Sequence, residues 1–369
     1  CALWVNGTKF VDTSFASFPY NTLNNLSFNK GDGGFSFYGK TKALAVYKTA
    51  LTDASLRSLT YPPAVATTFD LNFNTIAEQF TFTRGSEATF VNAQGLIQST
   101  ASNDAPRLDY STGAEAFLLE PQSTNLITYS SDFSQWDFFT GATLGSSFVV
   151  SPEGYNNATT LNFGSGSDSL IFFDYSSGSA TFTISVYARS STGKKFCFRN
   201  WNGSTAERSS DFTTTTEWKR FEFTFTSAVV NFGICNESSG VSGSIEIYGA
   251  QAELRTYPTS YIPTSGASAT RNQELCNNAT PVINSEEGTL YAEISGFEND
   301  LSDRYISLSD GTFNNSIRVF YYQDSGTVFF RKNVNGTQTT IFSTGAINKS
   351  ELTKIAIRYN STNFDVFSN

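Results

Sequence analysis

The sequence contains no histidine and no methionine, and only 15% of its 369 residues are charged. Without histidine, Ser-His-Asp and Cys-His catalytic groups and histidine-ligated metal sites are excluded. No apolar run approaches the roughly 20 residues that a membrane-spanning helix needs. We therefore expect a protein that is not an enzyme, and the lack of methionine predicts a processed product or a segment of a longer chain.

Basic residues are also scarce, because 24 lysines and arginines stand against 33 acidic residues and give a net charge of −9. Nucleic acids and anionic membrane surfaces bind clustered lysine and arginine, and the sequence contains no such cluster. We expect neither as a partner.

Aromatic residues are abundant, with 35 phenylalanines and 17 tyrosines. Apolar and polar residues alternate with a period of two over residues 182–187, 221–226 and 290–295, and Asn-Gly and Asp-Gly turn signals separate such runs. This pattern is typical of antiparallel sheets with one buried face. The predicted fold class is all-β, with tandem antiparallel β-sandwiches of the jelly-roll type.

Several spaced motifs occur in the central part of the chain, at residues 82–92, 106–110, 117–120, 124–130, 249–253 and 257–264. In this order they resemble a module of bacteriophage tail and virion structural proteins. The resemblance implies a galactose-binding-type jelly roll, similar to carbohydrate-binding modules, and it transfers no catalytic residue.

The two ends of the chain resemble complementary halves of one laminin-G-like, concanavalin A-like sandwich. Runs at 289–294 and 317–332 are similar to its first half, and runs at 35–40 and 44–47 are similar to its second half. We expect the second half of this sandwich at residues 1–62 and its first half at residues 286–369. Between them we expect a linker with a phage-type β segment (63–120), the jelly roll (121–273) and a second linker (274–285).

Half a sandwich exposes an apolar face and unpaired strand edges, so the two halves must find each other. They can pair within one chain as a circular permutation, pair between successive copies, or belong to a continuous tandem polypeptide. The last two arrangements predict a structural protomer of an extracellular or virion filament, whose partners are copies of itself joined head to tail. The alternative is a phage tail-fibre protein or surface adhesin whose jelly roll binds glycans.

Glycan binding requires aromatic platforms beside polar groups. Trp201, Tyr155 and Trp136 are the candidates, with core packing as the competing interpretation. No cofactor is expected apart from a structural calcium ion, for which Glu253 and Asp132 are the candidate ligands.

The four cysteines form no Cys-x-x-Cys pair, which argues against zinc and thioredoxin-type motifs. Cys197 and Cys235 fall in strand-like runs of the same predicted sandwich, where a disulfide and two buried thiols are the alternatives. Asn-x-Ser/Thr sequons permit glycosylation at ten positions. They begin at Asn6, Asn25, Asn157, Asn202, Asn236, Asn278, Asn314, Asn335, Asn348 and Asn360.

Overall fold

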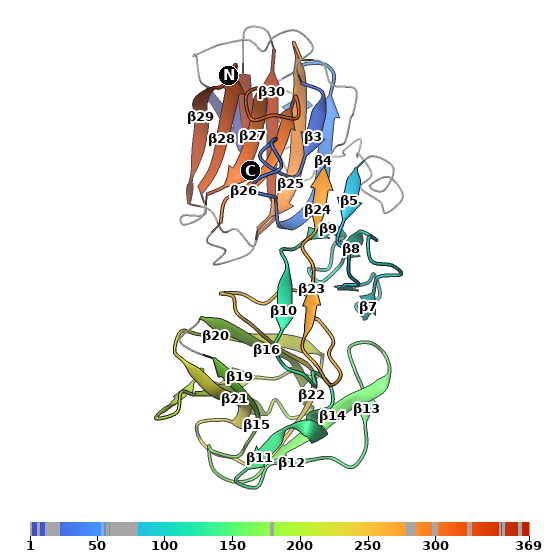
Figure 1. The fold of residues 1–369 in the computed structure, drawn as a ribbon, viewed down its shortest axis with the longest axis vertical. Helices are drawn as coiled ribbons and strands as arrows, with labels where there is room; N and C mark the ends of the chain where they lie inside the picture. The colour runs from blue at the N-terminus through green and yellow to red at the C-terminus, as the bar shows by residue number, and fades with distance from the viewer. Residues whose placement is uncertain are drawn as a thin grey trace. The chain divides into compact units, whose positions relative to one another are not determined.

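The chain folds into two compact units in a computed structural model (Figure 1). Unit 1 comprises Cys1–Glu87, Thr100–Pro121 and Gln273–Asn369, and unit 2 comprises Ala88–Ser99 and Gln122–Asn272. The structure describes residues 2–5, 8–11, 23–52, 55–56, 59, 80–177, 181–277, 285–296, 302–322, 327–346, 348, 351–360 and 364–368.

Unit 1 contains a six-stranded and a five-stranded sheet. The six-stranded sheet has the order β31 (Phe364–Ser368), β30 (Thr353–Tyr359), β25 (Gly288–Ser295), β4 (Gly39–Tyr47), β9 (Ala116–Leu119) and β8 (Arg107–Asp109). The five-stranded sheet has the order β29 (Thr337–Ala346), β28 (Thr327–Val334), β27 (Ser316–Tyr321), β26 (Arg304–Ser309) and β3 (Asn25–Ser27). Two short ladders pair β1 (Ala2–Val5) with β2 (Thr8–Val11) and β5 (Thr81–Thr83) with β24 (Leu275–Asn277).

Both sheets of unit 1 combine strands from the two ends of the chain. In the six-stranded sheet, β4 pairs with β25, so that Leu44 lies opposite Ala292. In the five-stranded sheet, β3 pairs with β26, so that Leu26 lies opposite Leu308. All four side chains belong to one buried apolar cluster. The described strands from the two chain ends therefore build one core within one chain.

Unit 2 is a sandwich of two six-stranded antiparallel sheets. One sheet consists of β11 (Asp137–Phe139), β15 (Leu170–Ser177), β21 (Val229–Asn236), β17 (Lys195–Trp201) and β18 (Ala206–Arg208), with β19 (Phe212–Thr213) also paired to β17. The other consists of β12 (Thr143–Leu144), β14 (Asn156–Phe163), β22 (Gly243–Glu253), β16 (Phe182–Arg189) and β20 (Lys219–Phe225), with β13 (Val149–Val150) also paired to β14. Smaller elements are β6 (Thr89–Val91), β7 (Ile97–Ser99), β10 (Ser123–Asn125), β23 (Ala269–Arg271) and the 3-10 helix η1 (Phe133–Gln135).

Alternating side chains explain why these segments form strands. Along β16, Phe182, Ile184 and Val186 point into the core of unit 2, where they meet Phe198 and Ile234 of the opposite sheet. Since successive side chains point to opposite faces, the intervening residues of each strand occupy the other face. The predicted all-β fold of antiparallel sandwiches is confirmed.

The division of the chain differs from the expected segments. The sequence predicts a linker and a separate β segment over residues 63–120, but Ala116–Leu119 pairs with β4 in the six-stranded sheet of unit 1. Ala88–Ser99 belongs to unit 2. Sequence spacing cannot reveal this division, because it depends on pairings between distant residues. Within the described residues, no helix has the length and apolarity to cross a membrane.

Candidate functional site

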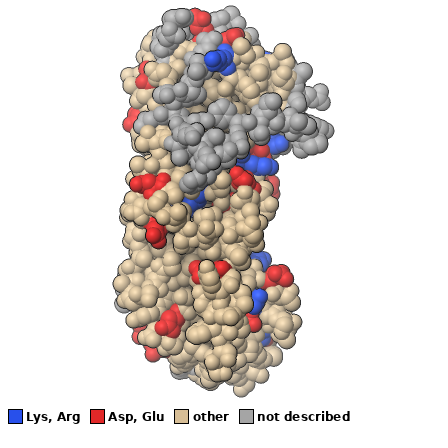
Figure 2. Space-filling view, turned by 90° about the vertical axis from the view of Figure 1, so that its right-hand side faces the viewer, with Lys and Arg blue, Asp and Glu red and all other residues tan. Residues whose placement is uncertain are grey.

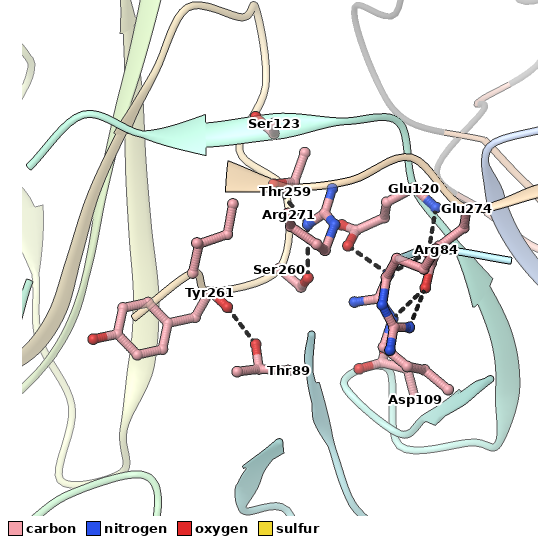
Figure 3. Close-up of polar contacts among 12 residues, drawn as sticks. Arg84, Thr89, Asp109, Glu120, Ser123, Thr259, Ser260, Tyr261, Arg271 and Glu274 are labelled. Carbon is pink, nitrogen blue, oxygen red and sulfur yellow. Dashed lines mark hydrogen bonds and ion pairs between the residues drawn. The ribbon is translucent and has the colours of Figure 1, made fainter. Parts of the chain in front are cut away.

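A buried ion-pair network in unit 1 joins Glu274 to one residue from each of the first three motifs, Arg84, Arg107 and Glu120 (Figure 3). Arg84 Nη1 donates to Glu274 Oε1 at 2.9 Å, and Arg107 Nε donates to the same oxygen at 2.8 Å. Arg107 Nη2 donates to Glu120 Oε2 at 2.8 Å and also to Glu274. None of these four side chains is more than 2% exposed.

Two arginines and two glutamates balance each other in this network. Burial alone would lower the pKa of Arg107, but the charges of Glu274 and Glu120 raise it above its ordinary value. The network joins three distant chain segments. Arg84, Arg107 and Glu120 of the motifs are therefore explained by the stability of unit 1.

Residues of the last two motifs, 249–253 and 257–264, form a hydrogen-bond network in unit 2 (Figure 3). Glu253 is fully buried and accepts hydrogen bonds from Gln251 Nε2 at 2.7 Å, from Thr259 N at 2.9 Å, and from the hydroxyls of Ser123 and Thr259. Arg271 Nη1 extends the network to Thr259 Oγ1 at 3.1 Å. Because protein donors occupy both Glu253 oxygens, this carboxylate does not serve as the expected calcium ligand.

The second calcium candidate lies elsewhere in unit 2. Asp132 is exposed and caps helix η1, where its Oδ1 accepts from Ser134 N at 3.2 Å and from Ser134 Oγ at 2.6 Å. Among the described residues, no group of three or more cysteine, aspartate or glutamate side chains is arranged to hold a metal ion.

A disulfide joins Cys197 on β17 to Cys235 on β21. These residues are directly opposite each other on neighbouring strands, with their Cα atoms 5.2 Å apart. Cys276 is a buried free thiol in the core of unit 1, and Cys1 lies outside the described residues.

Trp136 is a core residue and cannot be a glycan platform. Its side chain is 3% exposed and packs against Phe133 and Phe173, with ring centroids 5.2 and 5.7 Å away. Its Nε1 donates to Tyr129 O at 3.0 Å. Phe133 lies three residues before this tryptophan, whereas the contact with Phe173 of β15 is not apparent from the local sequence.

Trp201 lies at the end of β17, on the sheet face directed away from the core of unit 2. The register places Trp201 beside Asn231 of β21, and Asn231 beside Asp174 of β15. The next row on the same face contains Arg199, whose guanidinium carbon lies 5.5 Å from the centroid of the Trp201 ring. Trp201 is half-buried and Asp174 is exposed. One face therefore presents an aromatic ring, a guanidinium, an amide and a carboxylate.

Two polar atoms on this face are buried without a hydrogen-bond partner, namely Arg199 Nε and Asn231 Oδ1. Burial lowers the pKa of Arg199; Asp168 opposes this shift, whereas Arg208 adds to it. A buried donor and a buried acceptor without partners carry a desolvation cost that a ligand can relieve. These two atoms distinguish the face from an ordinary sheet surface.

The other sheet of unit 2 provides a useful contrast. There, Arg189 lies 4.7 Å from the centroid of the Trp218 ring, but its Nε donates to Glu246. Trp218 Nε1 donates to Val150 O at 3.0 Å. In this second Trp–Arg pair, the arginine Nε and the indole N–H therefore both donate to protein acceptors. In the Trp201–Arg199 pair, the arginine Nε has no acceptor.

Tyr155 is 70% exposed in the turn that precedes β14. The strand that follows it, β14, belongs to the other sheet of unit 2, so the structure does not bring Tyr155 and Trp201 together on one sheet face. Phe148, 68% exposed in the same part of unit 2, was not among the sequence candidates.

The sequons occupy different environments. Asn236 is fully buried, where its Oδ1 accepts from Lys194 Nζ at 2.8 Å, and its side chain is therefore not a glycosylation acceptor in the folded state. Exposed sequons begin at Asn314, Asn335 and Asn348, and half-buried ones at Asn25, Asn157, Asn202 and Asn360. Asn6 and Asn278 lie outside the described residues.

The face of the molecule in Figure 2 is mostly uncharged, with acidic and basic side chains scattered singly or in small groups. This distribution agrees with the low content of charged residues. On the visible described surface, no broad basic patch of the kind that binds nucleic acid is present.

Only two of the four residues of the Trp201 site could be predicted from the sequence. Trp201 and Arg199 are two residues apart, so the strand period places them on one face. Asn231 and Asp174 were missed, because the register of β21 and β15 brings them there. No sequence signal specifies this register.

No protein-family model matches the chain, and no curated protein matches it. Among solved structures, it is similar to the CBM22-1 xylan-binding domain from Paenibacillus barcinonensis Xyn10C, with 9% identity, a TM-score of 0.28, and coverage of 36% of this chain and 92% of that one. It is also similar to a family 29 carbohydrate-binding module, with 11% identity, a TM-score of 0.27, and coverage of 36% and 89%. A point mutant of such a family 29 module, complexed with cellulohexaose, gives 11% identity, a TM-score of 0.27, and coverage of 36% and 91%. We therefore base the function on the geometry of the site.

Proposed function

We propose that the chain is a non-enzymatic structural protein of a virion or extracellular surface, and that unit 2 binds glycans on the Trp201 face. The observation that carries the proposal is the half-exposed Trp201 ring beside Arg199 and Asn231, each of which has a buried polar atom without a partner. The motif resemblance to phage tail proteins supports the structural class.

The chemistry of a sugar fits this face. A pyranose presents C–H groups that pack on an aromatic ring, and hydroxyls that both donate and accept hydrogen bonds. Trp201 offers the ring, Arg199 offers donors, and Asp174 and Asn231 offer acceptors. A neutral or weakly charged glycan matches the mixed character of these groups.

The test measures binding of the full chain to a glycan array, followed by titration calorimetry with the best binder. We expect Trp201→Ala to weaken binding by about tenfold, since loss of an aromatic contact costs about 1 kcal/mol or more. Trp218→Ala is the matched control, because it removes the Trp–Arg pair of the other sheet. If no glycan binds, or if both variants weaken binding equally, the proposal is refuted.

Head-to-tail assembly is the second candidate function. The pairing of β4 with β25 and of β3 with β26 joins opposite ends of the chain, and the same ladders would form between copies if these ends were exchanged. Light scattering and electron microscopy of the purified full chain test this candidate. Fibres with a repeat of one chain would support it, whereas a monodisperse monomer would exclude it under the conditions used.

A further inference from the structure

The five-stranded sheet of unit 1 carries a polar and aromatic layer on the face directed away from the unit's core, and this layer is largely buried apart from Phe35 and Arg331 at its rim. Ile306, Val319 and Phe330 are neighbours across β26, β27 and β28 and belong to the core. The intervening rows, which occupy the other face, contain Tyr305, Phe320 and Phe329, and then Ser307, Arg318 and Arg331. We call these two rows, together with the neighbouring Lys30, Phe35, Phe313 and Asn333, the arginine face of unit 1.

Aromatic rings on this face form a continuous stack. The centroids of Tyr305 and Phe320 are 4.3 Å apart, and those of Phe320 and Phe329 are 5.5 Å apart, with nearly parallel planes in both pairs. Arg331 lies over Phe320 and Phe329, at 4.9 and 5.0 Å from their centroids. At the other end, the 55% exposed Phe35 contacts the edge of the stack at Tyr305.

Arg318 is the central cation of the arginine face and is only 1% exposed. Its guanidinium lies 4.2 Å from the centroid of Phe313, and its Nη2 donates to Asn333 Oδ1 at 2.7 Å and to Gln338 Oε1 at 3.0 Å. Its Nε has no partner. Two neighbours, Ser307 Oγ and Asn333 Nδ2, are also buried without a partner.

No carboxylate of the described residues forms an ion pair with Arg318 or Arg331, whereas the buried Arg84 and Arg107 both pair with glutamate. Burial lowers the pKa of Arg318 to about 10; Tyr305 and Asp32 oppose the shift, and Arg331 adds to it. Lys30 lies 4.9 Å from the same Phe313 ring and pairs with Asp32 at 3.0 Å. The two arginines are therefore the cations of this face that have no carboxylate in contact.

We propose that the arginine face of unit 1 binds the carboxylate or sulfate group of an acidic glycan. Arg331 supplies a half-buried charge at the rim, and the buried Arg318, whose Nε has no partner, adds positive charge beneath it. Planar oxyanions match guanidinium geometry, and the exposed Phe35 ring offers a surface for the sugar. A nucleic acid would require many more basic contacts than this face provides.

The test compares three probes on the full chain by titration calorimetry: an oligogalacturonate, a sulfated dextran oligomer and neutral dextran. The site predicts binding of at least one anionic probe and weaker binding of neutral dextran. Preference between carboxylate and sulfate identifies the source of the oxyanion. Equal affinity for neutral dextran and both anionic probes overturns the proposal, as does absence of binding to either anion.

Variants assign the site. Arg331→Gln removes a half-buried charge and should weaken binding of the anionic probe by about tenfold, as expected for a charged hydrogen bond. Arg318→Gln removes a charge beneath the rim and should weaken binding by a smaller factor, provided that its circular dichroism spectrum matches the wild type; Arg331→Gln decides the outcome if it does not fold. Lys48→Gln removes an exposed charge directly after β4, which belongs to the six-stranded sheet of unit 1, and should leave affinity unchanged. Equal losses in Lys48→Gln and Arg331→Gln would indicate non-specific attraction and overturn the proposal. Trp201→Ala, which tests the unit 2 site, should not change this binding.

Discussion

Replacement of Glu274 by glutamine tests the buried network of unit 1 most directly. Glu274 accepts from Arg84 Nη1 at 2.9 Å, Arg107 Nε at 2.8 Å and Glu120 N at 2.7 Å, and also from Arg107 Nη2. The substitution keeps the shape of the side chain but leaves two arginines with one glutamate in a fully buried site. Breaking a buried ion pair on one side costs about 3–5 kcal/mol, because the remaining charge stays unpaired.

Thermal unfolding followed by calorimetry measures this cost. For a unit of about 200 residues, a loss of about 3 kcal/mol lowers the melting temperature by about 10 °C. We expect this shift in the transition of unit 1, while the transition of unit 2 stays in place. Glu87→Gln makes the same chemical change at an exposed position of unit 1 and should shift the transition little. A loss below about 1 kcal/mol in Glu274→Gln would refute the buried network.

Three further predictions concern other parts of the chain. Replacing both Cys197 and Cys235 by serine should destabilise unit 2 by about 3–4 kcal/mol in chemical denaturation, because the disulfide closes a loop with a sequence separation of 38; an unchanged midpoint would contradict this. In a glycosylating expression host, peptide mass spectrometry should find glycan on the exposed Asn335 and none on the buried Asn236, and a modified Asn236 in folded protein would contradict its placement. Hydrogen bonds from the backbone N–H groups of Arg84 and Gly85 lower the pKa of Asp104. The ionised Asp104 therefore stabilises the fold above pH 3.8, and this contribution is lost as the pH falls through the lowered pKa. Asp104→Asn should make stability depend less on pH in the acid range, and an unaltered curve of stability against pH would refute this role.

The sequence predicted the type of fold because strand periodicity is a local property. Phe182, Ile184 and Val186 alternate with polar residues in the sequence, and all three lie in the core of unit 2. The turn signal Asn335-Gly336 connects β28 to β29, and both residues adopt positive φ values of 48° and 79°. This conformation suits asparagine and glycine, so the hairpin was predictable from two residues.

The site depended on non-local information. Trp136 and Trp201 are both candidate glycan platforms in the sequence, yet one is 3% exposed in the core and the other is half-buried on a sheet face. The sequon at Asn236 fits the glycosylation motif, but the fold brings Lys194 to its side-chain oxygen. These outcomes are set by cross-strand register and by distant contacts, which residue spacing along the chain does not encode.

The arginines of this chain separate structural positions from candidate binding positions. Acidic residues outnumber basic ones by 33 to 24, so an arginine without a carboxylate partner does not reflect a shortage of acids. Arg84 and Arg107 pair with glutamate in the interior. Arg199 and Arg318 each keep an Nε without a partner, each lies over an aromatic ring, and burial lowers the pKa of both. A buried N–H group without an acceptor costs stability in the free protein, because it has lost its hydrogen bonds to water. A ligand that supplies the missing acceptor removes this cost, and the free energy regained adds to its affinity. Arg199→Met should therefore weaken ligand binding while leaving thermal stability unchanged or higher, and a large stability loss would place Arg199 with Arg84 and Arg107. Arg318→Met also removes the hydrogen bond to the buried Asn333 Oδ1, so it should lower stability as well as binding.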